Sequence, residues 1–289
     1  MTAQWLKRVY TRLPVIRELR DIRDALRATS KIQNTIAIES FFKHELAHNP
    51  RYRDPRNLNH HEAQVFSQNG EDGFVAEIFR RIGTKDRIFV EVGVGDGLEN
   101  NTAYLLTQGW RGYWIEGDKD FVRMIRSHFH GPLGEGALTL LNALVDAENV
   151  ESLLVELGVP KQFDLLSLDI DRNTYHVWKA LRRFQPRVAV IEYNATFTPD
   201  VEWVANYAPL RQWNQSSYFG ASLKSYERLA EELGYALVGC DLTGTNAFFV
   251  RTTEKLDLFS VPFTAEHHYE PPRYWSVRRQ AHARCFDDN

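Results

Sequence analysis

Four polar side chains that could do chemistry follow two apolar segments in the middle of the chain. Asp169 and Asp171 come at the end of the first segment, and Glu192 and Asn194 come at the end of the second. If the two segments are neighbouring strands of a parallel sheet, their carboxyl ends bring these side chains around one crevice. Their oxygen atoms are hard ligands that suit Mg²⁺. Carboxylates that lie close together also raise each other's pKa, which suits one of them to act as a general base.

Three interpretations of this polar group stay open. The side chains could only cap strand ends and bind loops, they could act as a metal-free base or as substrate contacts, or all four could hold a metal ion. His176 follows on the next predicted helix and is a further candidate base, although most single histidines are structural. Tyr175, Tyr193 and Asn194 are candidates for lining the pocket of an acceptor molecule.

A glycine-rich turn that follows an earlier apolar segment has the pattern of a cofactor site. Residues 88–92 are predicted to form a short buried strand, and Gly93, Gly95 and Gly97 follow it at alternate positions. Glycines allow a sharp turn and let backbone N–H groups approach a ligand closely. Strand, turn and the start of the next helix therefore predict a nucleotide-binding corner. The alternative is a glycine-rich turn that binds no ligand.

Polar residues around this turn fit the same interpretation. Glu116 ends the next predicted strand, 19 positions after Gly97, and a carboxylate at about 20 residues can accept hydrogen bonds from two ribose hydroxyls. Asn101 can cap the helix that follows the turn. Gln68 and Glu71 start a helix that leads into the first strand, so we expect them near the corner as weaker candidates for cofactor or substrate contacts.

The turn does not have the dinucleotide-binding pattern G-x-G-x-x-G, because Leu98 occupies the place of the third glycine. It reads E-x-G-x-G-x-G and resembles the first motif of the class I S-adenosylmethionine-dependent methyltransferases. This resemblance implies that the turn packs against the methionine part of the cofactor, that Glu91 lies near its amino group and that Glu116 holds its ribose. The complete set of expected cofactor contacts is Glu91, Gly93, Gly95, Gly97, Asn101, Glu116, Ala143 and Gln68.

Further segments resemble the FkbM-type methyltransferases, and a bacterial branch of that group in particular. The resemblance spans roughly residues 65 to 251, but Arg172 stands where that group has glycine. Members of the wider group methylate hydroxyls on sugars and natural products, which implies O-methylation of a sugar, a polysaccharide or a small molecule. Metal-dependent O-methyltransferases of the catechol type place acids and an amide at the same two strand ends. That similarity implies Mg²⁺ as an optional second cofactor. The matching segments are 68–73, 91–101, 114–118, 169–175, 191–195 and 218–222.

Apolar strands alternate with amphipathic helices up to residue 192, which is typical of a parallel sheet covered on both faces. Residues 235–241 and 246–251 then predict a hairpin, and a terminal antiparallel hairpin is characteristic of the methyltransferase fold. We therefore expect an α/β protein with a Rossmann-like, seven-stranded methyltransferase sheet. Residues 199–219 are expected to form a long insertion over the active-site edge. Its aromatic side chains could stack on sugar faces or form a core of their own: Trp203, Tyr207, Trp213 and Tyr218.

The predicted domain boundaries are an N-terminal helical extension at residues 1–58, a methyltransferase domain at 59–254 and a C-terminal tail at 255–289. The extension could pack on its own domain, form a coiled coil with a second copy, or lie on a membrane surface. The last option, the least favoured, depends on Lys7, Arg8 and Arg12 beside three apolar side chains. The apolar stripe of the extension has heptad spacing: Val15, Leu19, Ile22, Leu26, Thr29, Gln33 and Ile36.

The composition argues against several classes of protein. A net charge of −3 argues against a general nucleic-acid binder. Cys240 and Cys285 give neither a disulfide framework nor zinc spacing. Without a long apolar run or an apolar signal core, we expect a cytoplasmic protein. The expected partner is a glycan or small-molecule acceptor. Two rival functions remain, a non-catalytic cofactor-binding scaffold and an NAD-dependent oxidoreductase.

Overall fold

The computed structural model describes residues 14–209, 214–276 and 284–286, and the chain divides into two compact units, residues 1–49 and 50–289. In the first unit the structure describes helix α2 (Pro14–His48). The apolar side chains of the heptad stripe, such as Leu19, Ile22 and Leu26, are exposed. Lys7, Arg8 and Arg12 lie outside the described residues. Among the helices that the structure describes, none has the length and apolar character needed to cross a membrane.

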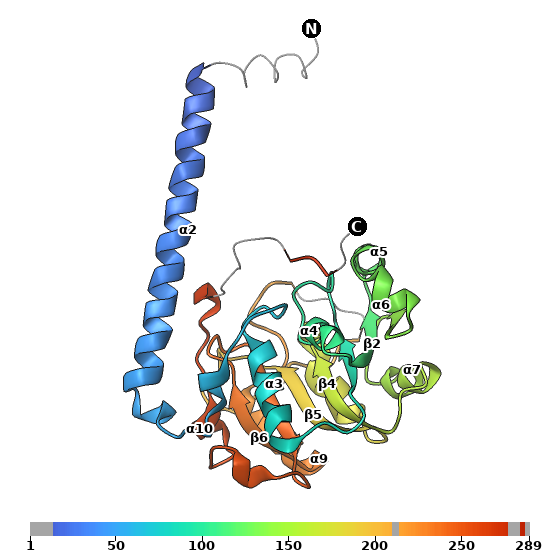
Figure 1. The fold of residues 1–289 in the computed structure, drawn as a ribbon. Helices are drawn as coiled ribbons and strands as arrows, with labels where there is room; N and C mark the ends of the chain where they lie inside the picture. Colours follow the sequence, from blue (N-terminus) through green and yellow to red (C-terminus); the bar gives the residue numbers. More distant parts are fainter. Residues whose placement is uncertain (1–13, 210–213, 277–283, 287–289) are drawn as a thin grey trace. The chain divides into compact units, whose positions relative to one another are not determined.

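The second unit is built on a seven-stranded sheet with the order β3-β2-β1-β4-β5-β7-β6 (Figure 1). The first five strands pair in parallel, whereas β7 runs antiparallel to both β5 and β6. This order and the reversed strand confirm the predicted methyltransferase sheet with its terminal hairpin. The strands are β1 (Ile88–Val92), β2 (Arg111–Glu116), β3 (Leu138–Asn142), β4 (Gln162–Leu168), β5 (Gln185–Glu192), β6 (Tyr235–Cys240) and β7 (Asn246–Arg251).

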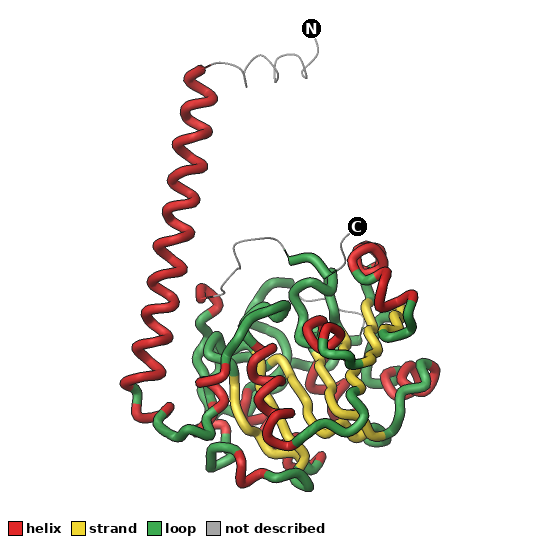
Figure 2. Tube along the Cα trace, in the orientation of Figure 1, coloured by secondary structure: helices red, strands yellow, loops and turns green. Residues whose placement is uncertain are grey.

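Helices cover both faces of this sheet (Figure 2). Side chains of neighbouring positions in a strand point to opposite faces, so Phe89 packs with the α3, α4 and α5 side, and Val90 packs with the α7, α8 and α9 side. The interior strands are consequently apolar on both faces. The helices are α3 (Glu71–Ile82), α4 (Ala103–Thr107), α5 (Lys119–His128), α6 (His130–Gly134), α7 (Val150–Glu156), α8 (Thr174–Ala180), α9 (Leu223–Leu233) and α10 (Ala265–His268), with 3₁₀ turns η1 (Pro50–Tyr52), η2 (Leu58–His61), η3 (Asp171–Asn173), η4 (Leu256–Leu258) and η5 (Tyr274–Ser276).

The second unit begins earlier in the chain than the boundary expected at residue 59. Asn59 donates from Nδ2 to the Cys240 carbonyl at 2.9 Å, and the Tyr52 hydroxyl donates to Glu270 at 2.8 Å. Residues on both sides of the expected boundary are thus bonded to the hairpin and to the C-terminal segment.

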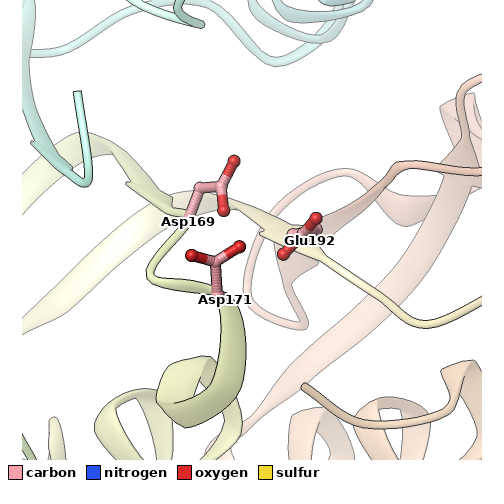
Figure 3. A group of neighbouring side chains, drawn as sticks. All are labelled: Asp169, Asp171 and Glu192. Carbon is pink, nitrogen blue, oxygen red and sulfur yellow. The ribbon is translucent and has the colours of Figure 1, made fainter. Parts of the chain in front are cut away.

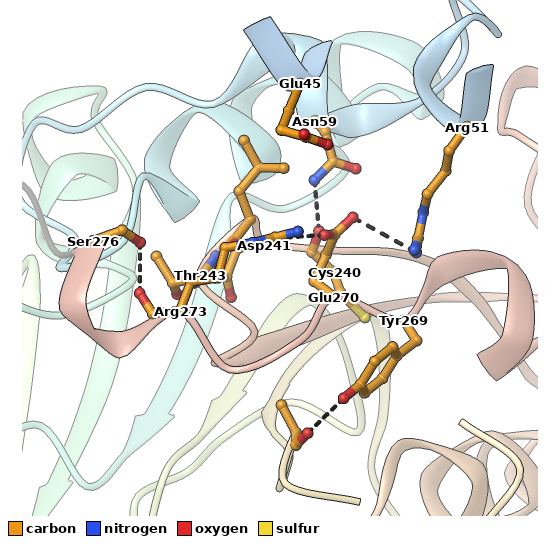
Figure 4. Close-up of polar contacts among 12 residues, drawn as sticks. Glu45, Arg51, Asn59, Cys240, Asp241, Thr243, Tyr269, Glu270, Arg273 and Ser276 are labelled. Carbon is orange, nitrogen blue, oxygen red and sulfur yellow. Dashed lines mark hydrogen bonds and ion pairs between the residues drawn. The ribbon is translucent and has the colours of Figure 1, made fainter. Parts of the chain in front are cut away.

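The C-terminal segment 269–276 is also part of this unit, although the sequence separates it as a tail. Arg273 donates to the Leu242 carbonyl and forms an ion pair with Glu270, and its N–H binds the Thr243 carbonyl (Figure 4). The Tyr269 hydroxyl binds the Ala195 carbonyl at 2.7 Å. The segment therefore lies against the carboxyl ends of β5 and β6.

At the opposite, amino-terminal edge of the sheet, buried charges are paired. Asp164 is fully buried and accepts hydrogen bonds from the backbone N–H groups of Lys85, Asp86 and Arg87. The Arg187 guanidinium lies 2.7 Å from Asp164 and 2.8 Å from Glu254. This network satisfies the buried carboxylate, as buried charges require.

Candidate functional site

Three carboxylates meet at the carboxyl ends of β4 and β5. Asp169 follows β4, Asp171 begins η3, and Glu192 ends β5 (Figure 3). One oxygen of each can be chosen so that the three atoms lie within 4.8 Å of one another. Oε2 of Glu192 has no hydrogen-bond partner among the described residues. The structure thus brings together three of the four residues that the sequence places around one crevice.

This cluster changes the protonation of its members. Burial and the charge of Asp171 raise the pKa of Asp169 to about 6, and burial raises that of Asp171. The pKa of Glu192 lies well above its usual range because of burial and then the charges of Asp169 and Asp171. Asp169 is the exposed member of the cluster, so repulsion between the carboxylates raises its pKa more than desolvation does.

The turn that carries Asp171 links the cluster to the insertion. Asp171 has a φ of 54°, in the left-handed region that costs an ordinary residue free energy. The guanidinium of Arg172 lies 4.8 Å from the Tyr218 ring centroid, and Asn173 exchanges hydrogen bonds with the backbone of Ala208. Within η3, Asp171 therefore belongs to the acid cluster, whereas Arg172 and Asn173 contact the insertion.

The glycine turn touches the acid cluster directly. Gly93 has a φ of 82°, and a Cβ there would lie 1.6 Å from the carbonyl oxygen of Asp169. Only glycine allows β1 and the end of β4 to approach this closely. A Cβ on Gly95, in contrast, would meet no atom within 4 Å. The predicted cofactor corner therefore lies directly beside the residue that carries the first carboxylate of the cluster.

Glu116 holds the glycine turn from the end of β2. Its Oε2 accepts hydrogen bonds from Val94 N at 3.0 Å and Gly95 N at 2.8 Å, and its Oε1 accepts one from Asp118 N at 2.8 Å. The predicted ribose-binding carboxylate therefore also orders the turn. Oε1 accepts only one of these bonds, so it keeps capacity for a ligand hydroxyl.

Glu91 lies beneath the turn, with 2% of its surface exposed. It accepts hydrogen bonds from Asn101 N at 3.0 Å, the Ser167 hydroxyl at 3.1 Å and the Thr102 hydroxyl. Burial raises its pKa to about 7. In this arrangement Glu91 joins β1 to the start of α4 instead of reaching a ligand, and its expected contact with the cofactor amino group stays a prediction.

The other predicted cofactor residues surround the same corner. Asn101 donates from Nδ2 to Ser167 at 3.1 Å, and the backbone of Ala143 donates to the Glu116 carbonyl at 3.1 Å. The Gln68 side chain is exposed, whereas Glu71 is buried and accepts hydrogen bonds from Asn69 and Asn246. Gln68 is therefore better placed than Glu71 to meet a ligand.

Two predicted substrate residues have different positions from those expected. Tyr193 and Asn194 are fully buried. The Tyr193 hydroxyl donates to the Glu270 carbonyl at 2.6 Å, and the Asn194 amide donates to the carbonyls of Ser217 and Phe219. Both side chains are hydrogen-bonded to other segments of the chain that pack over the end of β5. The local sequence does not signal this packing. The predicted roles in substrate binding, and of Asn194 in metal binding, would require these bonds to be replaced.

His176 and Tyr175 lie on α8. His176 Nε2 is 2.8 Å from the Ala205 carbonyl, and its ring packs on Tyr207 with centroids 5.0 Å apart. Tyr175 packs against Tyr226 at 5.6 Å. His176 therefore has a structural partner in the insertion, and its action as a base stays a prediction.

The aromatic residues of the insertion pack on one another and on their neighbours. Trp203 stacks on Phe197 with centroids 4.4 Å apart and meets the Tyr218 ring edge-on at 5.1 Å. Tyr207 packs on α8, and Tyr218 is 39% exposed. Trp213 lies outside the described residues. Both expected roles, stacking on sugar faces and forming a core of the insertion, stay predictions.

Two tyrosines that the sequence does not mark as candidates lie near the cluster. The Tyr226 hydroxyl on α9 is buried without a hydrogen-bond partner among the described residues, and its pKa is raised by burial and then by the charges of Glu192 and Asp169. Burial and then Glu192 also raise the pKa of Tyr274. Neither lies in a motif, so only the folded chain reveals them.

No family model matches the sequence, and no curated protein matches it either. Among solved structures, the glycopeptide N-methyltransferase MtfA in complex with S-adenosyl-L-homocysteine has a TM-score of 0.40 and 12% identity, over 65% of this chain and 92% of that one. An S-adenosylmethionine-dependent methyltransferase from Clostridium acetobutylicum has a TM-score of 0.38 and 11% identity, over 61% and 89%. One from Aquifex aeolicus has a TM-score of 0.36 and 12% identity, over 61% and 88%. The fold class rests on the strand order of this chain, and the function is argued from its site.

Proposed function

We propose that the protein is an S-adenosylmethionine-dependent methyltransferase that methylates a hydroxyl of a sugar, a polysaccharide or a small molecule. The observation that carries this proposal is the direct approach of Gly93 to Asp169, where a Cβ would lie 1.6 Å from the carbonyl oxygen. A cofactor held by the glycine turn would present its reactive end beside the carboxylates. Glu116, at the end of β2, would bind the ribose.

The chemistry requires orientation and a base. The cofactor would supply a methyl group activated by its sulfonium: as the acceptor oxygen forms the new C–O bond, the C–S bond would break with its electron pair returning to sulfur. The hydroxyl proton passes to a carboxylate of the cluster, for which Asp169 is the best candidate because it is the exposed member. Holding both reactants in line supplies most of the remaining acceleration.

A second proposal for the cluster is a divalent cation such as Mg²⁺. Three carboxylate oxygens within 4.8 Å and the unpartnered Oε2 of Glu192 fit a hard cation. Asp169, Asp171 and Glu192 would hold it, and the ion would lower the pKa of a bound hydroxyl. Calorimetric titration with Mg²⁺ tests this, because Glu192→Gln should abolish any binding that belongs to the cluster.

The first experiment is calorimetric titration with S-adenosylhomocysteine, followed by turnover of S-adenosylmethionine with a panel of glycan and small-molecule hydroxyl acceptors. Micromolar binding together with methylation of a hydroxyl acceptor is the expected result. Binding without turnover of any acceptor would favour the scaffold. Binding of NAD without binding of S-adenosylhomocysteine would favour the oxidoreductase and overturn the proposal.

A further inference from the structure

The end of the chain contacts the cofactor corner through one arginine. Arg284 donates from Nη2 to the Ser67 carbonyl at 2.9 Å and from Nη1 to the Leu98 carbonyl at 3.3 Å. Nη1 also lies 3.2 Å from a Glu99 carboxylate oxygen. The Arg284 side chain is only 10% exposed. In Figure 1 residues 284–286 form the short red segment near the C-terminal label.

These partners belong to two separate loops that both carry predicted cofactor contacts. Ser67 precedes Gln68 in the loop before α3, and Leu98 follows Gly97 in the turn after β1. A single guanidinium therefore connects the two loops. Its planar set of donors suits this bridging role, which a point charge such as the lysine ammonium fills less well.

The loop before α3 is itself tightly held. Oδ2 of Asp72 accepts hydrogen bonds from the backbone N–H groups of Val65, Phe66 and Ser67, at 2.7 to 2.8 Å. Arg284 is thus anchored on a fixed loop and acts on the glycine turn. The fixed loop before α3 therefore restrains the glycine turn through Arg284.

Phe286 adds a second, apolar connection. Its ring centroid lies 5.6 Å from that of Phe66 and 4.6 Å from that of Phe129. Phe129 packs edge-on against Trp114 at 4.7 Å, and Trp114 donates to the Thr102 hydroxyl, which in turn binds Glu91. A continuous series of contacts therefore joins Phe286 to the carboxylate beneath the glycine turn.

Phe129 also limits the turn from outside. A Cβ on Gly97 would lie 2.6 Å from the Phe129 ring. A displacement of that ring would consequently shift the turn, because closely packed groups transmit small movements.

We propose that Arg284 and Phe286 form a C-terminal clamp that positions the glycine turn and the Gln68 loop for cofactor binding. Arg284 is a positioning residue, since its contacts are two carbonyl oxygens and Glu99. The inference rests on the proposed function, because the ligand used to detect it is the cofactor product. Linkage requires reciprocity: if the docked clamp raises cofactor affinity, the bound cofactor must stabilise the docked clamp by the same factor.

The test compares calorimetric titrations with S-adenosylhomocysteine for full-length wild type, Arg284→Ala, Arg284→Lys and Phe286→Leu. The matched control is Arg80→Ala, because Arg80 is also an arginine in an ion pair but is 71% exposed on α3. Loss of the charged hydrogen bonds should weaken binding on the order of tenfold in Arg284→Ala. Arg284→Lys should recover part of this, and Arg80→Ala should bind as wild type. Wild-type affinity in both Arg284→Ala and Phe286→Leu would overturn the clamp.

A second readout separates positioning from folding. Cys285 is exposed and Cys240 is buried, and they are the two cysteines of the chain, so a thiol-reactive fluorophore labels Cys285 selectively. Because the clamp is docked in the structure without a ligand, the anisotropy should be high in wild type and lower in Arg284→Ala. If Arg284→Ala has the anisotropy of a wild type that binds S-adenosylhomocysteine, the clamp is overturned and the methyltransferase proposal stands. If folded wild type binds no ligand, the proposed function fails and this inference fails with it. If Arg284→Ala does not fold, Arg284→Lys and Phe286→Leu decide the outcome.

Discussion

Oε2 of Glu116 lies 2.8 Å from the backbone nitrogen of Gly95 and 3.0 Å from that of Val94. A carboxylate at the end of β2 thereby fixes the conformation of the turn after β1. The turn is held in place before any ligand binds, which reduces the entropy that binding must overcome.

Replacing Glu116 should therefore weaken cofactor binding in two ways. Glu116→Ala removes the predicted ribose acceptor and leaves two backbone donors of the turn unpaired, at a cost of about 1–3 kcal/mol. We expect S-adenosylhomocysteine binding to weaken by at least a factor of about 100. Glu116→Gln keeps one acceptor oxygen and should lose less. Calorimetry measures both variants, and equal affinities for Glu116→Ala and wild type would contradict this role.

Gly93 and Gly95 should respond differently to the same added methyl group. Gly93→Ala places a Cβ 1.6 Å from a backbone oxygen at a φ of 82°, so we expect little folded protein. Gly95→Ala meets no atom within 4 Å and has only the strain of a φ of 64°, about 1 kcal/mol. It should fold and yet bind S-adenosylhomocysteine poorly, because the new methyl group projects into the expected cofactor space. Thermal unfolding and calorimetry together test the pair.

Glu91 should make stability depend on pH. Its pKa is raised from 4.5 to about 7, mainly by burial, so the folded state holds a proton that the unfolded chain releases. This contribution is complete below about pH 4.5 and is lost as the pH rises toward about 7, by on the order of 3 kcal/mol. Glu91→Gln should remove this slope. Urea unfolding at several pH values provides the measurement, and an unchanged slope would show that Glu91 is ionised in the folded protein.

Helix α2 provides a separate prediction. We propose that its exposed heptad stripe forms a coiled coil between two copies. In a parallel pair, Glu18 of one copy would lie opposite Arg23 of the other. Sedimentation of wild type should show a dimer, and a Leu19→Glu/Leu26→Glu variant should be monomeric. A monomeric wild type at tens of micromolar, the usual range for such measurements, would contradict the proposal.

The sequence predicts those features of the fold that have a local signal. Strand β7 runs over Asn246–Arg251 as predicted, because a short apolar run lies between clear turns. Helix α8 ends at Ala180, and Glu151 accepts hydrogen bonds from the backbone N–H groups of Arg182 and Arg183 just beyond it. That contact joins distant parts of the chain, and no periodicity signals it.

The same distinction applies to the site. Asp169, Asp171 and Glu192 are predictable because the carboxyl ends of parallel strands must meet. The burial of Tyr193 and the docking of Arg284 depend on partners far away in sequence, namely Glu270 and Ser67. Such pairings join segments that are far apart in the sequence, which residue type and spacing do not specify.

The acid cluster also has a consequence for turnover. The methyl donor carries a positive charge on sulfur, whereas the product thioether is neutral. Ionised carboxylates at the ends of β4 and β5 would attract the first and not the second. Under the proposed function, the reaction itself removes this attraction, which weakens the binding of the spent cofactor and favours its exchange for a new donor. Added salt should consequently slow capture of the donor more than it changes release of the product.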